Sequence, residues 1–207
     1  MYYLGNINFM EEFKLNYNSK TLGLSERTFR LVLSAVMIGL ATVLSLFHPW
    51  PSMPLGGSVT LCSMLPILLI GYRYGVRWGL FTGFVYALIQ LLIDAGKVLS
   101  WGMTPTAVVA SFIFDYLVAF TVLGLAGIYG KGFVRYLFGM TTAVALRFAS
   151  HFISGVTAYA SFLPDQWKGN LWLYSLIYNG AYLLPDLLIC LVVGAIAYKS
   201  LKKYIEA

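Results

Sequence analysis

The sequence predicts an all-α, polytopic integral membrane protein with six transmembrane helices and both termini on the cytoplasmic side. Of its 207 residues, 59% are hydrophobic and 11% are charged, whereas a soluble domain has about a quarter charged residues. The mean hydropathy is +0.77. The charges lie mostly between long apolar blocks, as in chains that cross a membrane several times. This composition excludes a globular cytosolic enzyme, a disordered chain and a typical nucleic-acid-binding protein.

The N-terminal region differs from the rest of the chain. Residues 1–26 are mixed and polar, and they are predicted to form a cytoplasmic segment, with Ser25 as the N-cap of the next helix. They contain Glu11 and Glu12 and lack the basic, apolar and small-residue regions of a cleaved signal peptide. Residues 27–207 are predicted to form a single transmembrane domain.

Six apolar blocks are predicted to span the membrane. They cover residues 29–47, 59–72, 78–93, 105–129, 138–162 and 171–198. The first has no charge over 19 residues, which is about 28 Å of helix. The second is short and contains Pro66. Residues 48–57 and 94–104 are predicted to be loops because prolines, glycines or charges interrupt the apolar pattern there.

The distribution of lysine and arginine predicts the orientation. Eleven of the 14 basic residues lie near alternate helix ends, which we assign to the cytoplasmic side. The other three are Lys97 and Lys168, on the opposite side, and Arg147, within a span. Both termini are therefore predicted to be inside.

Small residues recur at a spacing of four on two of the predicted helices. Gly75, Gly79, Gly83 and Ala87 form a stripe where another helix can approach closely, and we predict internal packing there. Ala35 and Gly39 form a shorter stripe on the first helix. For that pair, docking onto another membrane subunit and internal packing are equally good interpretations.

Polar residues deep within spans carry most of the functional information, since a charge there is costly and faces a cavity or a partner. Asp115 lies midway along the fourth block. Arg147 and His151 are four residues apart on the fifth, and Gly155 and Tyr159 continue the same stripe. Taken singly, Asp115 and Arg147 could be a structural ion pair, and His151 could be a buried histidine bonded to backbone.

The sixth block adds polar and aromatic residues in its outer half, and an interfacial aromatic belt would explain them singly. They are Trp172, Tyr174, Tyr178, Asn179 and Tyr182. Together with the stripe on the fifth block, they favour a binding site. An acid, an imidazole, an amide and aromatic faces suit a flat, nitrogen-rich, cationic ligand.

Catalytic and energy-coupling motifs are mostly absent from the sequence. With one intramembrane acid, two histidines and no HExxH motif, neither an enzyme nor a metal or cofactor is expected. The two cysteines, Cys62 and Cys190, lack a CxxC spacing. Residues 124–131 lack the spacing of a phosphate-binding loop. Any ATPase that drives transport must therefore be another chain.

Several motifs resemble the thiamine-specific substrate-binding subunit (S component) of energy-coupling factor (ECF) vitamin transporters. The resemblance covers about residues 29–200 and is strongest in the last two motifs. The motifs are Gly56-Gly-Ser-Val-Thr-Leu61 with Leu65-Pro66, Tyr72-Arg-Tyr-Gly75, Phe114-Asp-Tyr116, Arg147-Phe-Ala-Ser-His-Phe-Ile-Ser-Gly155 and Trp172-Leu-Tyr-Ser-Leu-Ile-Tyr-Asn-Gly180.

The resemblance implies a set of substrate-binding residues. They are Asp115, Tyr116, His151, Gly155, Tyr159, Tyr174 and Asn179, with Trp50 as a loop aromatic over the ligand. Asp115, where some members have Glu, would bind the aminopyrimidine of thiamine. Tyr159 replaces the family's stacking tryptophan and offers a weaker π face. Ala35 and Gly39 resemble the motif by which such subunits dock on the coupling subunit.

The resemblance implies a plasma-membrane subunit of a prokaryote that binds thiamine outside the cell. Its partners would be a transmembrane coupling subunit, two cytoplasmic ATPase subunits and the lipid bilayer, but no nucleic acid. Two alternatives remain open: a binding subunit for another vitamin or thiamine precursor, and a stand-alone secondary transporter with Asp115 and His151 as a proton relay.

Overall fold

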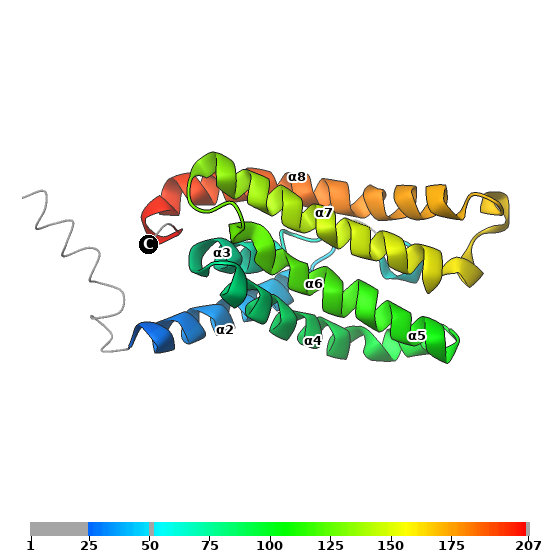
Figure 1. The fold of residues 1–207 in the computed structure, drawn as a ribbon. Coiled ribbons are helices and arrows are strands. Elements are labelled where there is room, and N and C mark those ends of the chain that lie inside the picture. Colours follow the sequence, from blue (N-terminus) through cyan, green and yellow to red (C-terminus); the bar gives the residue numbers. More distant parts are fainter. Residues whose placement is uncertain (1–24, 50–51, 206–207) are drawn as a thin grey trace, which may run out of the picture. The chain divides into compact units, whose positions relative to one another are not determined.

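The structure is a computed structural model that describes residues 25–49 and 52–205 of the chain. Within these ranges all regular secondary structure is helical (Figure 1). The chain divides into two compact units, Met1–Val36 and Met37–Ala207. Most of the predicted cytoplasmic segment 1–26, as well as Trp50, lies outside the described residues.

Helix α2 extends over Glu26–Ser45 and corresponds to the first predicted span. Its start confirms Ser25 as the N-cap, because the Ser25 Oγ accepts a hydrogen bond from the Thr28 backbone N–H at 3.2 Å. Such a bond satisfies one of the four backbone donors that the first turn of a helix leaves unpaired. The short helix η1 (Pro54–Gly56) follows in the connection to α3.

Helices α3 (Leu65–Tyr74) and α4 (Val76–Ser100) are joined by a one-residue turn at Gly75, which has φ +84°. A residue with a side chain is strained in this conformation. Helix α4 continues through residues 94–100, so the predicted loop at 94–104 is wrong over most of its length. Its charges, Asp94 and Lys97, occupy the last turns of the helix, where both side chains line a cavity.

The fourth block folds as a continuous helical segment with an irregular centre. It consists of α5 (Pro105–Ser111), η2 (Phe112–Val118), α6 (Ala119–Thr121) and η3 (Val122–Gly127). The segment η2 is π-helical and contains Asp115 and Tyr116. Such wide turns are rare within α-helices and frequently occur at functional sites.

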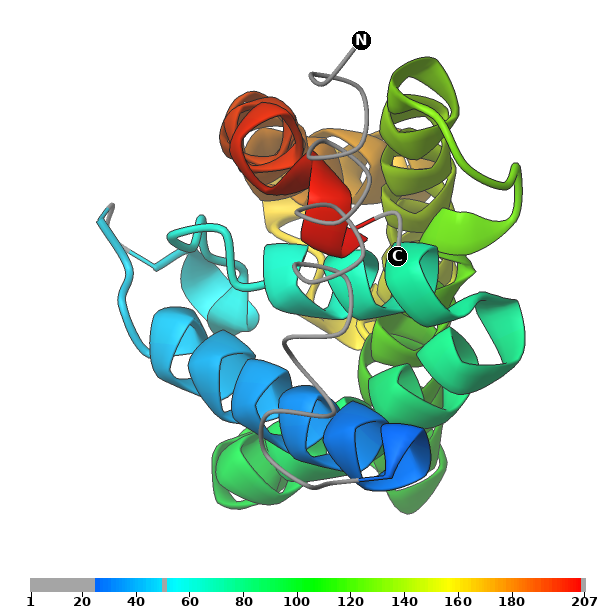
Figure 2. The same cartoon turned by 90° about the vertical axis from the view of Figure 1, so that its left-hand side faces the viewer.

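Helices α7 (Phe133–Thr157) and α8 (Leu171–Ile205) run side by side along the second unit (Figure 1). Helix α7 ends before residue 162, because the chain turns through η4 (Ala160–Phe162) and η5 (Asp165–Trp167). The segment that precedes α3, drawn in cyan, lies against α8 (Figure 2) and is joined to it by hydrogen bonds from Gly57 to Tyr178 and from Thr60 to Asp186.

Two glycines of the predicted stripe on α4 confirm that it packs internally. A Cβ atom added at Gly79 would lie 3.0 Å from the Gly124 carbonyl carbon, and one added at Gly83 would lie 2.8 Å from the Thr121 carbonyl oxygen. Helix α4 therefore contacts η3 and α6 backbone to backbone, which a larger residue would prevent. Gly75 does not share this packing, since it forms the turn before α4.

Four helical segments of the described residues are long and apolar enough to cross a membrane. They are Glu26–Ser45, Val76–Ser100, Pro105–Gly127 and Leu171–Ile205. The chain is thus an all-helical membrane protein. Helix α3 has only 10 residues, so the second predicted block is too short for a full span by itself. Six spans and the inside location of both termini stay predictions.

Candidate substrate-binding site

A cavity of about 220 Å³ lies in the second unit. Its walls come from the end of α2, the connection to α3, and the segments α4, η2, α7 and α8. The lining includes each predicted binding residue that the structure describes: Asp115, Tyr116, His151, Gly155, Tyr159, Tyr174 and Asn179. The segments η2, α7 and α8 and the turn after α7 thus bring these residues to one place.

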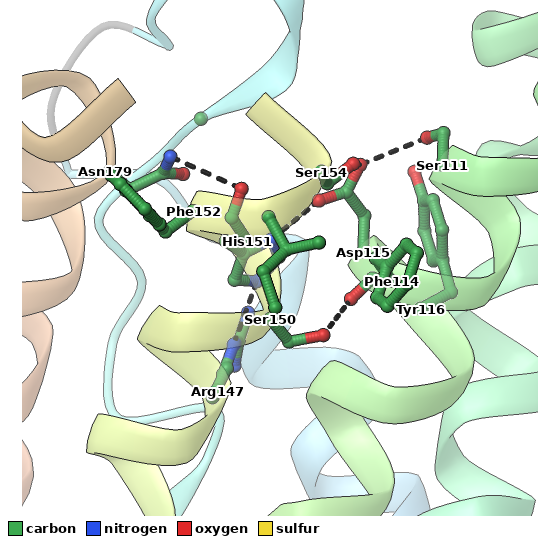
Figure 3. Close-up of polar contacts among 12 residues, drawn as sticks. Ser111, Phe114, Asp115, Tyr116, Arg147, Ser150, His151, Phe152, Ser154 and Asn179 are labelled. Atoms are coloured by element: carbon green, nitrogen blue, oxygen red, sulfur yellow. Dashed lines mark hydrogen bonds and ion pairs between the residues drawn. The ribbon is translucent and has the colours of Figure 1, made fainter. Parts of the chain in front are cut away.

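The Asp115 carboxylate accepts three hydrogen bonds (Figure 3). Its Oδ2 accepts from Ser154 Oγ at 2.6 Å and from Ser111 Oγ at 3.0 Å, and its Oδ1 is 2.8 Å from His151 Nδ1. A carboxylate has about four acceptor positions. One position therefore remains for a donor that enters the cavity, and it lies on Oδ1.

Arg147 and His151 extend this network along α7 (Figure 3). The Arg147 Nε–H donates to His151 Nε2 at 3.2 Å. The Nε2 atom must then be unprotonated, so the proton of a neutral imidazole lies on Nδ1 and points to Asp115. In the described part of the chain, Asp115 and Arg147 are joined through His151, and the direct ion pair considered from the sequence is wrong.

Several aromatic rings line the cavity. The Tyr159 hydroxyl is 3.0 Å from Ser111 Oγ, so this ring is connected to the Asp115 network. The Trp101 ring packs edge-on against Tyr159 with a centroid distance of 5.9 Å. Tyr174 and Tyr178 on α8 have centroids 5.8 Å apart and line the cavity from the other side.

Asn179 is held at the contact between α7 and α8. Its Nδ2 donates to the Ser175 carbonyl at 2.9 Å, and its Oδ1 accepts from the Tyr182 hydroxyl at 2.8 Å. Gly155 lies opposite on α7, where an added Cβ would overlap Ser175 Oγ and lie 3.0 Å from Ser175 Cβ. The absence of a side chain at Gly155 therefore sets the close approach of the two helices.

Replacing Gly155 with alanine is expected to destabilise the protein by about 1–3 kcal/mol, as overpacking does elsewhere. The Ser175 side chain could relieve the overlap by rotating, but it would then lose the hydrogen bond that its Oγ donates to the Phe152 carbonyl at 3.0 Å. Thermal unfolding of the purified variant tests this expectation. The matched control is Gly180→Ala, where the nearest atoms to an added Cβ are 3.8 Å away. Equal stability of the two variants would contradict the close packing at Gly155.

The cavity also contains residues that the sequence analysis missed. Asp94, Lys97 and Trp101 line it from the end of α4. The Asp94 Oδ2 accepts a hydrogen bond from the Tyr116 hydroxyl at 3.2 Å. These residues were assigned to a loop because charges interrupt the apolar pattern. A helical spacing of three between Asp94 and Lys97 was the available signal that they share a face.

A second intramembrane acid was also overlooked. Asp186 on α8 is 2% exposed, and it accepts hydrogen bonds from Thr60 Oγ1 at 3.1 Å to each carboxylate oxygen. The expectation of a single acid within the spans is therefore wrong. An aspartate after Pro185 in an apolar run was a visible signal.

Within residues 25–49 and 52–205, no group of three or more His, Cys, Asp or Glu could hold a metal ion.

Comparison with known proteins identifies the family. Residues 31–206 match the profile of the thiamine transporter protein family (Thia_YuaJ). The chain belongs to this family. The match confirms the resemblance found in the motifs of the sequence, and it covers all the described cavity-lining residues.

Individual members of the family are similar over most of their length. The thiamine transporter ThiT of Bacillus subtilis is 32% identical over 198 residues, which cover 88% of this chain and 97% of that protein. ThiT of Lacticaseibacillus paracasei is 30% identical over 151 residues, which cover 64% and 70%. A structure of ThiT from Listeria monocytogenes has a TM-score of 0.70 at 21% identity and covers 88% of this chain and all of that chain. This likeness shows that the fold is shared.

The two residues predicted to dock on a partner lie on α2 and are not among the residues that line the cavity. Both Ala35 and Gly39 are exposed, and an added Cβ at Gly39 would meet no atom within 4 Å. Among the described residues of the second unit, none lies where a side chain at position 39 would begin. This observation favours a surface role for Gly39 over internal packing.

Proposed function

We propose that this chain is the thiamine-binding S component of an ECF-type vitamin transporter, and that the cavity binds thiamine. Its named relatives are thiamine transporters. The observation that carries the proposal is the convergence of seven predicted binding residues from η2, α7, the turn after α7, and α8 on one cavity. Asp115, Tyr116, His151, Gly155, Tyr159, Tyr174 and Asn179 are the proposed substrate-binding residues, and Trp50 is proposed to cover the ligand.

The acceptor and donor pattern supports an aminopyrimidine as the ligand's polar part. The free position on Asp115 Oδ1 suits an amino group, which would add a charge-assisted hydrogen bond. The ring would lie among His151, Tyr159 and Trp101, which line the same cavity. Stacking on such faces is favourable for a flat heteroaromatic ligand.

The charges around the cavity favour a ligand with one positive charge. Asp115 and Asp186 are largely buried carboxylates, and Arg147 is a buried guanidinium next to a neutral His151. Asp94 and Lys97, which also line the cavity, carry opposite charges. These five groups together leave one net negative charge, and the thiazolium of thiamine would neutralise it. A buried charge without a counter-charge is costly, so the cation stabilises the bound state.

The chain is proposed to lie in the plasma membrane and to transport thiamine together with partner subunits. Residues 27–207 form one six-span domain in the plasma membrane of a prokaryote, with residues 1–26 and the C-terminus in the cytoplasm. The ligand enters from outside, and the chain releases it inward when a transmembrane coupling subunit and two cytoplasmic ATPases are bound. The exposed Gly39 supports a partner on α2, since small residues allow close helix approach.

Uptake by reconstituted protein tests the transport part of the proposal. Liposomes that contain this chain alone are expected to bind radiolabelled thiamine without accumulating it, with or without a pH gradient. Liposomes that also contain the coupling subunit and ATPases should accumulate thiamine when ATP is supplied. Accumulation by this chain alone would contradict the proposal.

A proton-coupled carrier is the second candidate function, and the hydrogen bond between Asp115 and His151 at 2.8 Å favours it. Such a pair could exchange a proton with the ligand site. The same liposome experiment separates the two candidates, because a proton-coupled carrier accumulates thiamine when only a pH gradient is imposed.

Tyr159 is expected to form a wall of the thiamine site. Tyr159→Ala should weaken thiamine binding by about 1–3 kcal/mol, since it removes a largely buried aromatic face. Tyr159→Trp should keep or strengthen binding, because indole offers a stronger π face. Isothermal titration of the purified variants measures both effects. If the alanine variant titrates like the parent, Tyr159 does not contact the ligand.

Tyr159→Phe is the matched control for the hydroxyl. It keeps the ring against Trp101 but removes the hydrogen bond to Ser111. A small loss in this variant and a large loss in Tyr159→Ala would assign the effect to the ring. Equal losses would assign it to the hydrogen bond and thus to the orientation of Ser111 beside Asp115.

A further inference from the structure

Arg147 lines the same cavity as the proposed ligand contacts and is joined to His151. Its side chain is buried, and its guanidinium carbon lies 4.3 Å from the centroid of the Phe120 ring. The Arg147 Nη1 atom is buried without a hydrogen-bond partner. A buried cation in a membrane is costly. Such a residue is therefore expected to have a compensating interaction or a functional role.

The nearest polar contact of Arg147 is the imidazole of His151. The Arg147 Nε–H donates to Nε2 at 3.2 Å, and Nδ1 lies 2.8 Å from Asp115 Oδ1 on the opposite side of the ring. The donated bond leaves Nε2 only as an acceptor, so the ring proton is on Nδ1. Nδ1–H then donates to the carboxylate.

We propose that Arg147 is a positioning residue that fixes the tautomer of His151 and, through it, the orientation of the Asp115 carboxylate toward the ligand. The other tautomer would present a lone pair of Nδ1 to Oδ1, and two acceptors at 2.8 Å repel one another. The carboxylate would then turn and lose the free acceptor position on Oδ1. The ligand part of this inference rests on the proposed function.

Asp186 balances the charge of Arg147 in this arrangement. It interacts electrostatically with Arg147 from α8 and is itself fixed by Thr60. The groups that face the imidazole are Asp115 on η2, Arg147 on α7 and Tyr182 on α8, whose ring centroid is 6.1 Å away. Of these, Arg147 is the one that donates to Nε2. Asp115 accepts from Nδ1–H, and Arg147 is the group that keeps a proton off Nε2.

Nitrogen-15 NMR of the histidine side chains tests the tautomer directly and without ligand. The chain has two histidines, and a spectrum of His48→Gln assigns the signal of His151. In the parent protein, Nδ1 is expected to carry the proton. In Arg147→Met the Nε2 signal should shift toward that of a protonated nitrogen, whereas Arg147→Lys, which keeps a cationic donor, should retain the parent form. Arg135→Met, on the exposed start of the same helix, is the matched control.

Calorimetric titration with thiamine completes the test. Arg147→Met is expected to raise the Kd at least about tenfold, with substantial rescue in Arg147→Lys. If Arg147→Met does not fold because Asp186 is left uncompensated, the double variant Arg147→Met/Asp186→Asn removes both charges and is used for both measurements.

Three results would overturn the inference: an Nε2–H imidazole in the parent protein, an unchanged tautomer after removal of Arg147, or a changed tautomer with an unchanged Kd. Failure of the parent protein to bind thiamine would instead overturn the proposed function. The NMR result without ligand would then still decide whether Arg147 fixes the tautomer.

Discussion

Asp115→Asn is expected to weaken thiamine binding at least tenfold, about 1.4 kcal/mol. The amide has no charge and can accept on one side only. Its oxygen must face His151 Nδ1–H at the 2.8 Å contact, and its NH₂ group then faces Ser111 and Ser154, whose hydroxyls can rotate to accept. The protein should stay folded, since a neutral amide is easier to bury than an ion. Titration calorimetry and thermal unfolding measure the two effects.

Two variants serve as controls for Asp115→Asn. Asp165→Asn makes the same chemical change at a side chain that is 91% exposed, and it should bind thiamine like the parent. Asp115→Glu keeps the charge, and it should bind better than the amide although the carboxylate must shift. A collapse of stability in Asp115→Asn, with or without ligand, would mean that this acid is structural. A stable variant with unchanged affinity would mean that Asp115 has neither role.

Gly39→Leu is expected to abolish transport while leaving thiamine binding intact. A leucine at an exposed position of α2, where an added Cβ meets no atom within 4 Å, would keep a coupling subunit from approaching the helix. Folding should not suffer, because leucine favours a helix by roughly 1 kcal/mol over glycine. The measurements are thiamine uptake by cells that produce the whole transporter, and titration of the purified chain.

The matched control for docking is Gly96→Leu on α4. Gly96 is also exposed and has no atom within 4 Å of an added Cβ. This variant should transport thiamine like the parent. If Gly39→Leu transports normally as well, α2 does not use Gly39 to dock. If it loses thiamine binding or unfolds, Gly39 packs within the protein.

Hydropathy predicted the helical class of this membrane protein because apolar blocks of helix length have few other uses. The ends of the helices were predicted less well. Residues 94–100 continue α4 because Asp94 and Lys97 face a cavity, where a polar side chain is tolerated within a helix. A linear hydropathy pattern cannot distinguish a charge that faces a cavity from one that faces the aqueous loop.

The site was predictable to the extent that its polar residues interrupt apolar helices. Asp115, His151 and Asn179 were found in this way, and the structure brings them to one cavity. The π-helical turn η2 was not predictable from periodicity, since it changes the spacing on which the periodicity depends. The link from Arg147 to Asp115 through His151 also required coordinates, because helical spacing shows only which residues share a face.

A calorimetric titration of the detergent-purified chain tests the central claim most directly. The titrants are thiamine, its phosphates, the isolated aminopyrimidine and the isolated thiazole. We expect saturable binding of thiamine, competition by the aminopyrimidine, and at least a tenfold loss of thiamine affinity in Asp115→Asn. No saturable binding of thiamine, or binding that Asp115→Asn does not alter, would contradict it.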